Sequence, residues 1–183
     1  MKNILKRFGI PAVIAASLLV MVGCLVSGTF VVIADLDDHC FTAAKHFYYY
    51  HVDLTAESEW NDHKDKIDFI DAVGFDFWIT NSSSDSATFT VWLSGHTATI
   101  DTSSIQAIKD NATEVFGGLT VGAGDSVHVT YGESLGFVKN LTALKNLVKD
   151  GKFNYFGLSE GTFADDEVCW DSAKAVITVS AGN

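Results

Sequence analysis

The chain has 183 residues, and its 12 Lys+Arg against 23 Asp+Glu give a formal net charge of −11. Arg7 is the only arginine. A nucleic-acid binder contacts phosphates through several cations, so we expect no nucleic-acid partner. With 48% hydrophobic and 12% aromatic residues, the chain is also too apolar to be intrinsically disordered.

The N-terminal segment has the three parts of an export signal. It begins with positive charge and continues as a short apolar run over residues 10–22. A small residue, Gly23, then stands directly before Cys24. The cations of this segment are Lys2, Lys6 and Arg7.

Residues 21–24, Met-Val-Gly-Cys, resemble the lipobox of bacterial lipoproteins, with Met21 where leucine is usual. The resemblance implies cleavage before Cys24, diacylglycerol on its sulfur and acylation of the new amino terminus. Several acyl chains anchor a protein stably, whereas one binds only marginally. By the same resemblance, Leu25 in place of an aspartate favours the outer membrane of a bacterial cell envelope.

An uncleaved membrane helix is the alternative, because no charge occurs over residues 8–34 and a span needs about 20 apolar residues. The polar residues 27–29 interrupt that stretch, and the β-branched residues that follow suit a strand better. We therefore expect a signal peptide over residues 1–23. Residues 24–183 then form one domain with nine cations, 23 anions and a net charge of −14.

Two further cysteines, Cys40 and Cys169, remain in this domain. Two thiols in an exported protein are more often paired than free, so we expect a disulfide between them. Two separate buried thiols are the alternative.

Alternating apolar and polar residues predict most of the domain to be β-strand. The expected strands cover residues 26–34, 41–54, 67–80, 87–93, 119–121, 127–131, 153–156 and 168–180. Short polar turns at 81–86 and 122–125 predict two β-hairpins. In the first hairpin strand, the residues expected to point inward are Phe69, Val73, Phe75, Phe77 and Ile79.

Helical spacing of apolar residues predicts three helices. One covers 56–66 with Thr55 as its cap, and a short one lies within 97–115, capped near Asp101 or Ser103. The third is amphipathic, over 137–150, and ends at Gly151. The fold class we expect is mainly β: an antiparallel β-sandwich with this amphipathic helix and one or two short helices. The whole chain resembles small envelope lipoproteins with a β-sandwich body, a resemblance that implies no particular activity.

Residues 132–136 match the G-x-S-x-G pattern of serine hydrolases, with Ser134 as nucleophile, and stand between a predicted strand and a predicted helix. All six histidines precede Ser134, although the hydrolase order places the base after it. Without a base a serine hydroxyl is a poor nucleophile. We therefore favour a helix-capping role for Ser134 and expect no enzyme activity.

Two acidic clusters flank the cysteines, and a disulfide would bring them together. Carboxylate oxygens are calcium ligands, but no EF-hand spacing is present, so solvated turns are the simpler interpretation and no cofactor is expected. The weak calcium candidates are Asp35, Asp37, Asp38, Asp165, Asp166 and Glu167.

Four aromatic residues lie on the strand parity opposite to the expected inward one: Tyr48, Tyr50, Trp78 and Trp92. Exposed together they could stack sugars, whereas a covered sheet face would make them core residues. The function we expect is a lipid-anchored envelope protein with a non-enzymatic binding or structural role, and the partners we expect are the membrane, through the lipid, and an envelope protein or glycan. A carbohydrate-binding module is the first alternative and a serine hydrolase the second.

Overall fold

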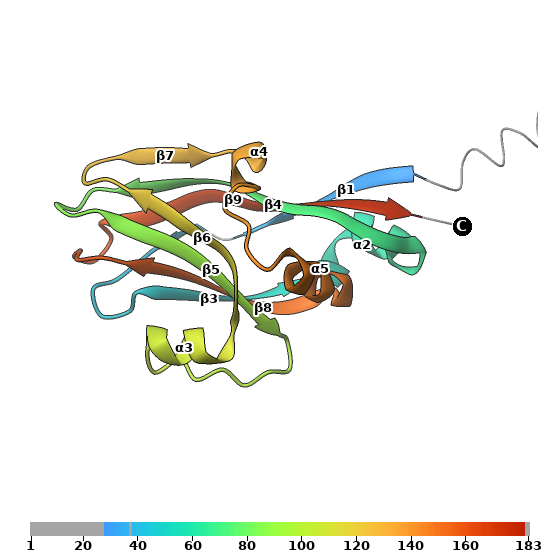
Figure 1. Ribbon diagram of the computed structural model, residues 1–183, viewed down its shortest axis with the longest axis horizontal. Helices are drawn as coiled ribbons and strands as arrows, with labels where there is room; N and C mark the ends of the chain where they lie inside the picture. The colour runs from blue at the N-terminus through green and yellow to red at the C-terminus, as the bar shows by residue number, and fades with distance from the viewer. Residues whose placement is uncertain (1–27, 37, 182–183) are drawn as a thin grey trace, which may run out of the picture.

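The structure, a computed structural model, describes residues 28–36 and 38–181. The signal-peptide segment, Cys24 and Asp37 lie outside the described residues. Two antiparallel β-sheets face each other across a common core (Figure 1). The expected antiparallel β-sandwich is confirmed.

Five strands form the first sheet, in the order β1-β9-β4-β7 with β2 paired to β9: β1 (Gly28–Asp35), β2 (His39–Cys40), β4 (Ile67–Asn81), β7 (Ser126–Val129) and β9 (Val168–Ala181). The second sheet has the order β3-β8-β5-β6: β3 (Phe47–Asp53), β5 (Ala87–Gly95), β6 (Thr113–Val121) and β8 (Lys152–Glu160). The helices are η1 (Leu54–Ala56), α2 (Ser58–His63), η2 (Lys64–Lys66), α3 (Ile105–Asn111), α4 (Tyr131–Ser134) and α5 (Leu141–Asp150).

Neither expected hairpin forms, because both turns cross from one sheet to the other. β4 and β5 lie in different sheets, and so do β6 and β7. Asn81 is buried where the two turns meet, and its Nδ2 donates to the carbonyls of Asp85, Val121 and Gly122. These side-chain hydrogen bonds stabilise the turns that cross between the sheets. The alternation of apolar and polar residues is the same in a hairpin and in such a crossing, so the sequence pattern does not separate the two.

The parity expected for β4 is wrong at Phe69, which is 69% exposed. Its pairing with β9 shifts register between Ile67 and Phe69 and again between Ile70 and Ala72. These irregularities turn Phe69 outward and Ile70 inward, as β-bulges do. Beyond them, the expected inward residues Val73, Phe75, Phe77 and Ile79 are all buried.

Strand β8 continues through Gly157 to Glu160. The strand expected here covers only residues 153–156 and ends at that glycine. A Cβ on Gly157 would lie 3.3 Å from the Tyr155 hydroxyl and 3.6 Å from the Phe89 ring. The glycine therefore makes room for core aromatics within a strand and is not a terminator.

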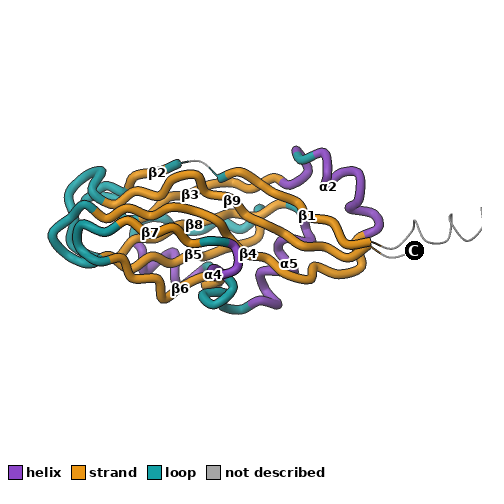
Figure 2. The backbone as a smooth tube through the Cα atoms, turned by 90° about the horizontal axis from the view of Figure 1, so that it is seen from above, coloured by secondary structure: helices purple, strands orange, loops and turns teal. Residues whose placement is uncertain are grey.

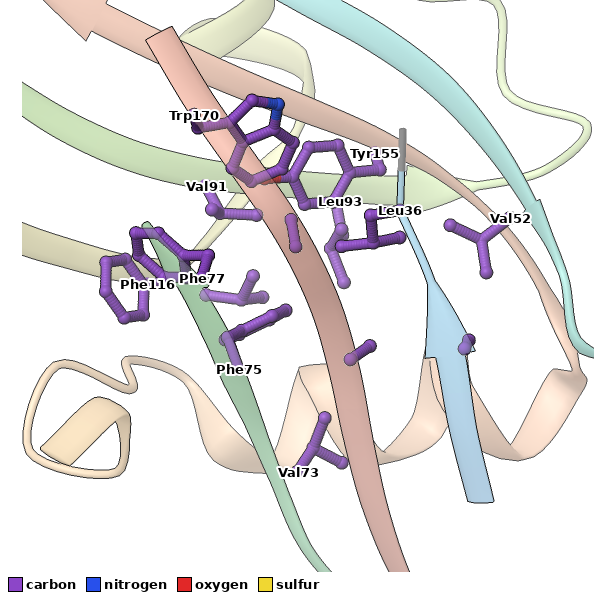
Figure 3. Close-up of a cluster of buried hydrophobic side chains, with 14 of the residues drawn as sticks. Leu36, Val52, Val73, Phe75, Phe77, Val91, Leu93, Phe116, Tyr155 and Trp170 are labelled. Carbon is purple, nitrogen blue, oxygen red and sulfur yellow. The ribbon is translucent and has the colours of Figure 1, made fainter. Parts of the chain in front are cut away.

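Aromatic rings fill the centre of the sandwich (Figure 3). Trp170 lies 5.3 Å from Tyr155, 5.4 Å from Phe89 and 6.0 Å from Phe77 between ring centroids. Phe116 lies 5.7 Å from Phe77 in the same cluster. Both sheets contribute to this cluster, so it joins the two layers.

Helix α5 closes one open side of the sandwich, with Leu144 and Val148 buried against strands of both sheets. It ends at Gly151, whose φ of 77° suits a glycine cap. The helices begin differently from expectation: α5 begins at Leu141 and not at residue 137, Ser104 caps α3, and residues 54–66 divide into η1, α2 and η2. Among the described residues, no helix has the length and hydropathy to cross a membrane.

Seen from above, most loops gather at one end of the molecule, and α2 lies toward the other end (Figure 2). That second end also holds Gly28 of β1, paired with Ala181 of β9. On the two outer faces, α3 lies beside the four-stranded sheet and α4 beside the five-stranded sheet (Figure 1).

Candidate functional site

A disulfide joins Cys40 to Cys169, 129 residues apart in sequence. The two residues face each other across β2 and β9. The bond therefore joins β2, near the start of the domain, to β9, its last strand. Both β1 and β2 pair with β9, one after the other along its length.

The carboxylates near this disulfide bind the backbone. Asp38 accepts a 2.6 Å bond from the Ser172 amide, and Asp165 accepts a 2.8 Å bond from the Ala43 amide. Glu167 bonds in the same way to the amide of Ala164, at 2.6 Å. Within the described part of the chain, no three His, Cys, Asp or Glu side chains are grouped to hold a metal ion.

Ser134 is fully buried at the end of α4. Its hydroxyl donates 2.7 Å to the Tyr131 carbonyl and accepts 2.8 Å from the Phe75 amide. Ser134 was expected to cap the amphipathic helix that follows it, but the N-cap of that helix, α5, is Asn140, so this role is wrong. The cap of α4 itself is Thr130, which forms a capping box with Glu133. Ser134 instead attaches α4 to β4. Its hydroxyl is hydrogen-bonded to two backbone groups, whereas a nucleophilic serine needs a general base as its partner.

The four aromatic candidates do not share a surface. Tyr48 and Tyr50 pack against the main core, which confirms for them the alternative that these rings are core residues, and the outward parity given to them is wrong. Trp92 is half-buried beside α3, and its Nε1 donates to Thr90. Trp78 is 44% exposed on the other sheet, stacked on His128 at 4.6 Å.

The outward residue of the Phe-Tyr-Tyr-Tyr run is Tyr49, which is 45% exposed. It borders a groove of about 250 Å³ on the outer face of the four-stranded sheet, which we call the Tyr49 groove. Its floor is aromatic, from Phe47 of β3 and Phe156 of β8, and a loop between β5 and α3 forms its far wall. The residues lining it are Lys45, Phe47, Tyr49, Ala98, Ile100, Thr102, Asn154 and Phe156.

Asn154 is the polar centre of this groove and is only 3% exposed. Its Oδ1 accepts 3.1 Å from the Tyr49 hydroxyl and lies 3.2 Å from Nδ1 of His51. Its Nδ2 donates 3.0 Å to the Gly95 carbonyl at the start of the far wall. One buried amide therefore orients the exposed tyrosine and fixes the loop opposite it.

Lys45 supplies the cation of the groove. Its Nζ lies 4.6 Å from the centroid of the Phe47 ring, within the range of a cation–π contact. Burial, together with the charge of Lys45, lowers the pKa of nearby His39, against an opposing effect of Asp166. The His39 ring stacks on Tyr48 at 4.1 Å, beneath the opposite face of β3.

The sequence pattern did not reveal this groove, because the parity predicted for β3 was wrong. The signal was present, since Phe47, Tyr49 and His51 alternate with Tyr48 and Tyr50. Alternation alone does not show which of these two sets of residues faces the core. That depends on β8, whose residues are buried on both faces.

A comparison with protein-family models gave no match, and neither did one with curated protein sequences. Among solved structures, a chain of desmodium yellow mottle tymovirus is 9% identical with a TM-score of 0.38, over 85% of this chain and 87% of that one. A chain of infectious bursal disease virus strain Gx is 10% identical with a TM-score of 0.31, over 86% of this chain and 33% of that one. Similarity at this level carries no argument about function.

Proposed function

We propose that the protein is an exported, lipid-anchored component of a bacterial cell envelope with a non-enzymatic binding role. Two features support the proposal: the lipobox at residues 21–24 and the disulfide between Cys40 and Cys169. The disulfide carries most weight, because such bonds persist in oxidising compartments outside the cytoplasm. The lipid on Cys24 then anchors an acidic domain that has little attraction of its own for an anionic membrane.

Metabolic labelling of the full chain with radioactive palmitate tests the anchor. We expect label in the parent protein and none in Cys24→Ser. Ser27→Ala is the matched control, because it changes a nearby small residue and leaves the lipobox intact. Absence of label from the parent would reject the proposal.

For the bound ligand, the Tyr49 groove favours a sugar. Its half-exposed tyrosine offers a ring face for stacking, and the residues beside it supply hydrogen-bond donors and acceptors for hydroxyl groups. The volume of about 250 Å³ is small, so a single sugar ring or the end of a chain is the size expected. This site replaces the separate aromatics Tyr48, Tyr50, Trp78 and Trp92 as the candidate carbohydrate surface.

Titration with chito-oligosaccharides and maltose, followed by calorimetry, tests this ligand class. We expect Tyr49→Ala to weaken binding by about two- to tenfold, because stacking contributes about 0.5–1.5 kcal/mol beyond the buried area. Trp78→Ala, on the other sheet, is the matched control and keeps the parent affinity. No binding by the parent protein, or equal losses in both variants, would reject the sugar-binding role.

A further inference from the structure

The outer face of the five-stranded sheet is apolar along β1, the first strand of the described chain. Val31 and Ile33 of β1 are 48% and 53% exposed, and Phe69 of β4 is 69% exposed. Register places β9 between them, with Val31 opposite Thr178 and Ile33 opposite Val176. We call this surface, with Ala72 of β4 opposite Thr178, the outer apolar face.

Strand β1 has the sequence of a strand that is covered on both sides. Val32 and Ala34 point into the core and are buried, whereas Val31 and Ile33 point outward. A run of apolar residues on both faces is typical of strands buried on both sides. In the described residues only the inner side of β1 is covered, so its outer side has the composition of a contact surface.

The exposure of Phe69 follows from the register shifts of β4. Without them, its odd position would place it with buried Val73 and Phe75. Bulges that re-aim a side chain recur where that side chain has a use. The outward position of the Phe69 ring, which is 69% exposed, is therefore explained if a partner contacts it.

The position of Gly28, the first described residue, indicates which partner lies closest to this face. Phe69 and Thr29 both pair with Ser180, so the three residues form one row across the sheet. At about 4.8 Å per strand, Phe69 lies about 10 Å from Thr29. Four residue steps separate Cys24 from Gly28, which span at most about 14 Å. A lipid on Cys24 therefore brings this row within reach of the bilayer surface.

We propose that the acylated protein rests the outer apolar face against the bilayer, with Phe69 in the headgroup region. The proposal rests on the lipid anchor proposed above. The two sheets are stacked layers, so their outer faces point in opposite directions (Figure 1). The Tyr49 groove lies on the outer face of the other sheet and would then point away from the membrane.

The charges on this surface select the kind of lipid. Asp71 lies beside Phe69, and the row beyond Ile33 contains Asp35, Lys174 and Asp76. Three carboxylates against one lysine repel an anionic headgroup. The face therefore suits a zwitterionic bilayer, in which apolar burial carries the contact.

Acylated full-length protein in phosphatidylcholine vesicles with brominated acyl chains tests the orientation. Bromine quenches nearby indoles, so we compare Phe69→Trp with the matched variant Tyr49→Trp, subtracting the native tryptophans of the parent protein. We expect the added fluorescence of Phe69→Trp to fall at least twofold and that of Tyr49→Trp to stay unchanged.

The outcomes separate the two proposals. If the parent protein fails to float with the vesicles, the anchor is wrong and the orientation falls with it. If it floats but Phe69→Trp is not quenched, only the orientation is overturned, and cross-linking between copies through this face would show that a second molecule covers it. Equal quenching at both positions would also overturn the proposal, since the domain would then have no fixed face toward the lipid.

Discussion

The side-chain amide of Asn81 donates a 3.1 Å hydrogen bond to the backbone carbonyl of Val121, 40 residues away. Asn81 ends β4 and Val121 ends β6, and each residue precedes a crossing to the opposite sheet. The backbone amide of Asn81 also donates 2.8 Å to the Asp125 carbonyl. One buried side chain therefore holds both crossings at the same end of the sandwich.

Replacing Asn81 by alanine leaves those carbonyls without their donor. We expect Asn81→Ala to lower the free energy of unfolding by about 2–3 kcal/mol, measured by urea denaturation. Ser84→Ala, at an exposed position of the same turn, is the control and should change it by less than about 0.5 kcal/mol. Equal effects of the two variants would contradict the role given to Asn81.

The hydroxyl of Tyr155 is buried and has no hydrogen-bond partner in the described part of the chain. An unpaired buried polar group is costly, so Tyr155→Phe should leave the free energy of unfolding unchanged or raise it by up to about 1 kcal/mol. Tyr155→Ala removes the ring as well and should cost about 3–5 kcal/mol. A clear loss of stability in Tyr155→Phe would mean that the hydroxyl contributes to folding.

Burial, with a smaller effect of Tyr48, raises the pKa of Tyr155 well above 10. The folded state then keeps a proton that the unfolded state loses, so stability is full below about pH 10 and falls as the pH rises above it. We expect this alkaline decline to be smaller in Tyr155→Phe than in the parent, in denaturation series between pH 8 and pH 11. An identical decline in both proteins would exclude Tyr155 as its cause.

Asp53, the last residue of β3, is paired with Lys152 of β8 at 2.7 Å. The hydrogen bond from Lys152, followed by bonds from Thr55, lowers the pKa of Asp53 from 3.8 to about 2. The associated stability is therefore present above about pH 3.8 and is lost as the pH falls through about 2. Carbon-detected NMR titration should return this pKa, and Lys152→Met should move it toward 3.8. An unmoved pKa would assign the shift to Thr55 alone.

Ser134 offers a test of the serine hydrolase alternative. Because its hydroxyl joins Tyr131 to Phe75, Ser134→Ala should destabilise the protein by about 1–3 kcal/mol. A fluorophosphonate probe should leave the folded parent unlabelled, with a known serine hydrolase as positive control. Labelling that disappears in Ser134→Ala would establish an active nucleophile.

The sequence predicted the layers of this protein better than their connections. Alternation located β9, in which one set of alternating residues, Ala173, Ala175, Ile177 and Val179, is buried. It could not show that β4 and β5 separate at Asn81, because strands in one hairpin and strands in two facing sheets have the same pattern. It also could not locate the shift at Phe69, since a bulge changes parity without changing composition.

The candidate site was the least predictable part. Its groove depends on Tyr49, Asn154 and a loop of the β5–α3 connection, which come together only through the pairing of β3 with β8. The sequence offered aromatics and acids as candidates, but burial and backbone hydrogen bonds account for most of them. The lipid on Cys24 stays a prediction, because that residue lies outside the described part of the chain.

The most direct test of the central claim is the mass of the N-terminal peptide from protein purified from bacterial membranes. We predict a chain that begins at Cys24 and carries a diacylglyceryl group on its sulfur, with Cys40 and Cys169 joined. A peptide that still begins at Met1 with an unmodified Cys24 would contradict the account.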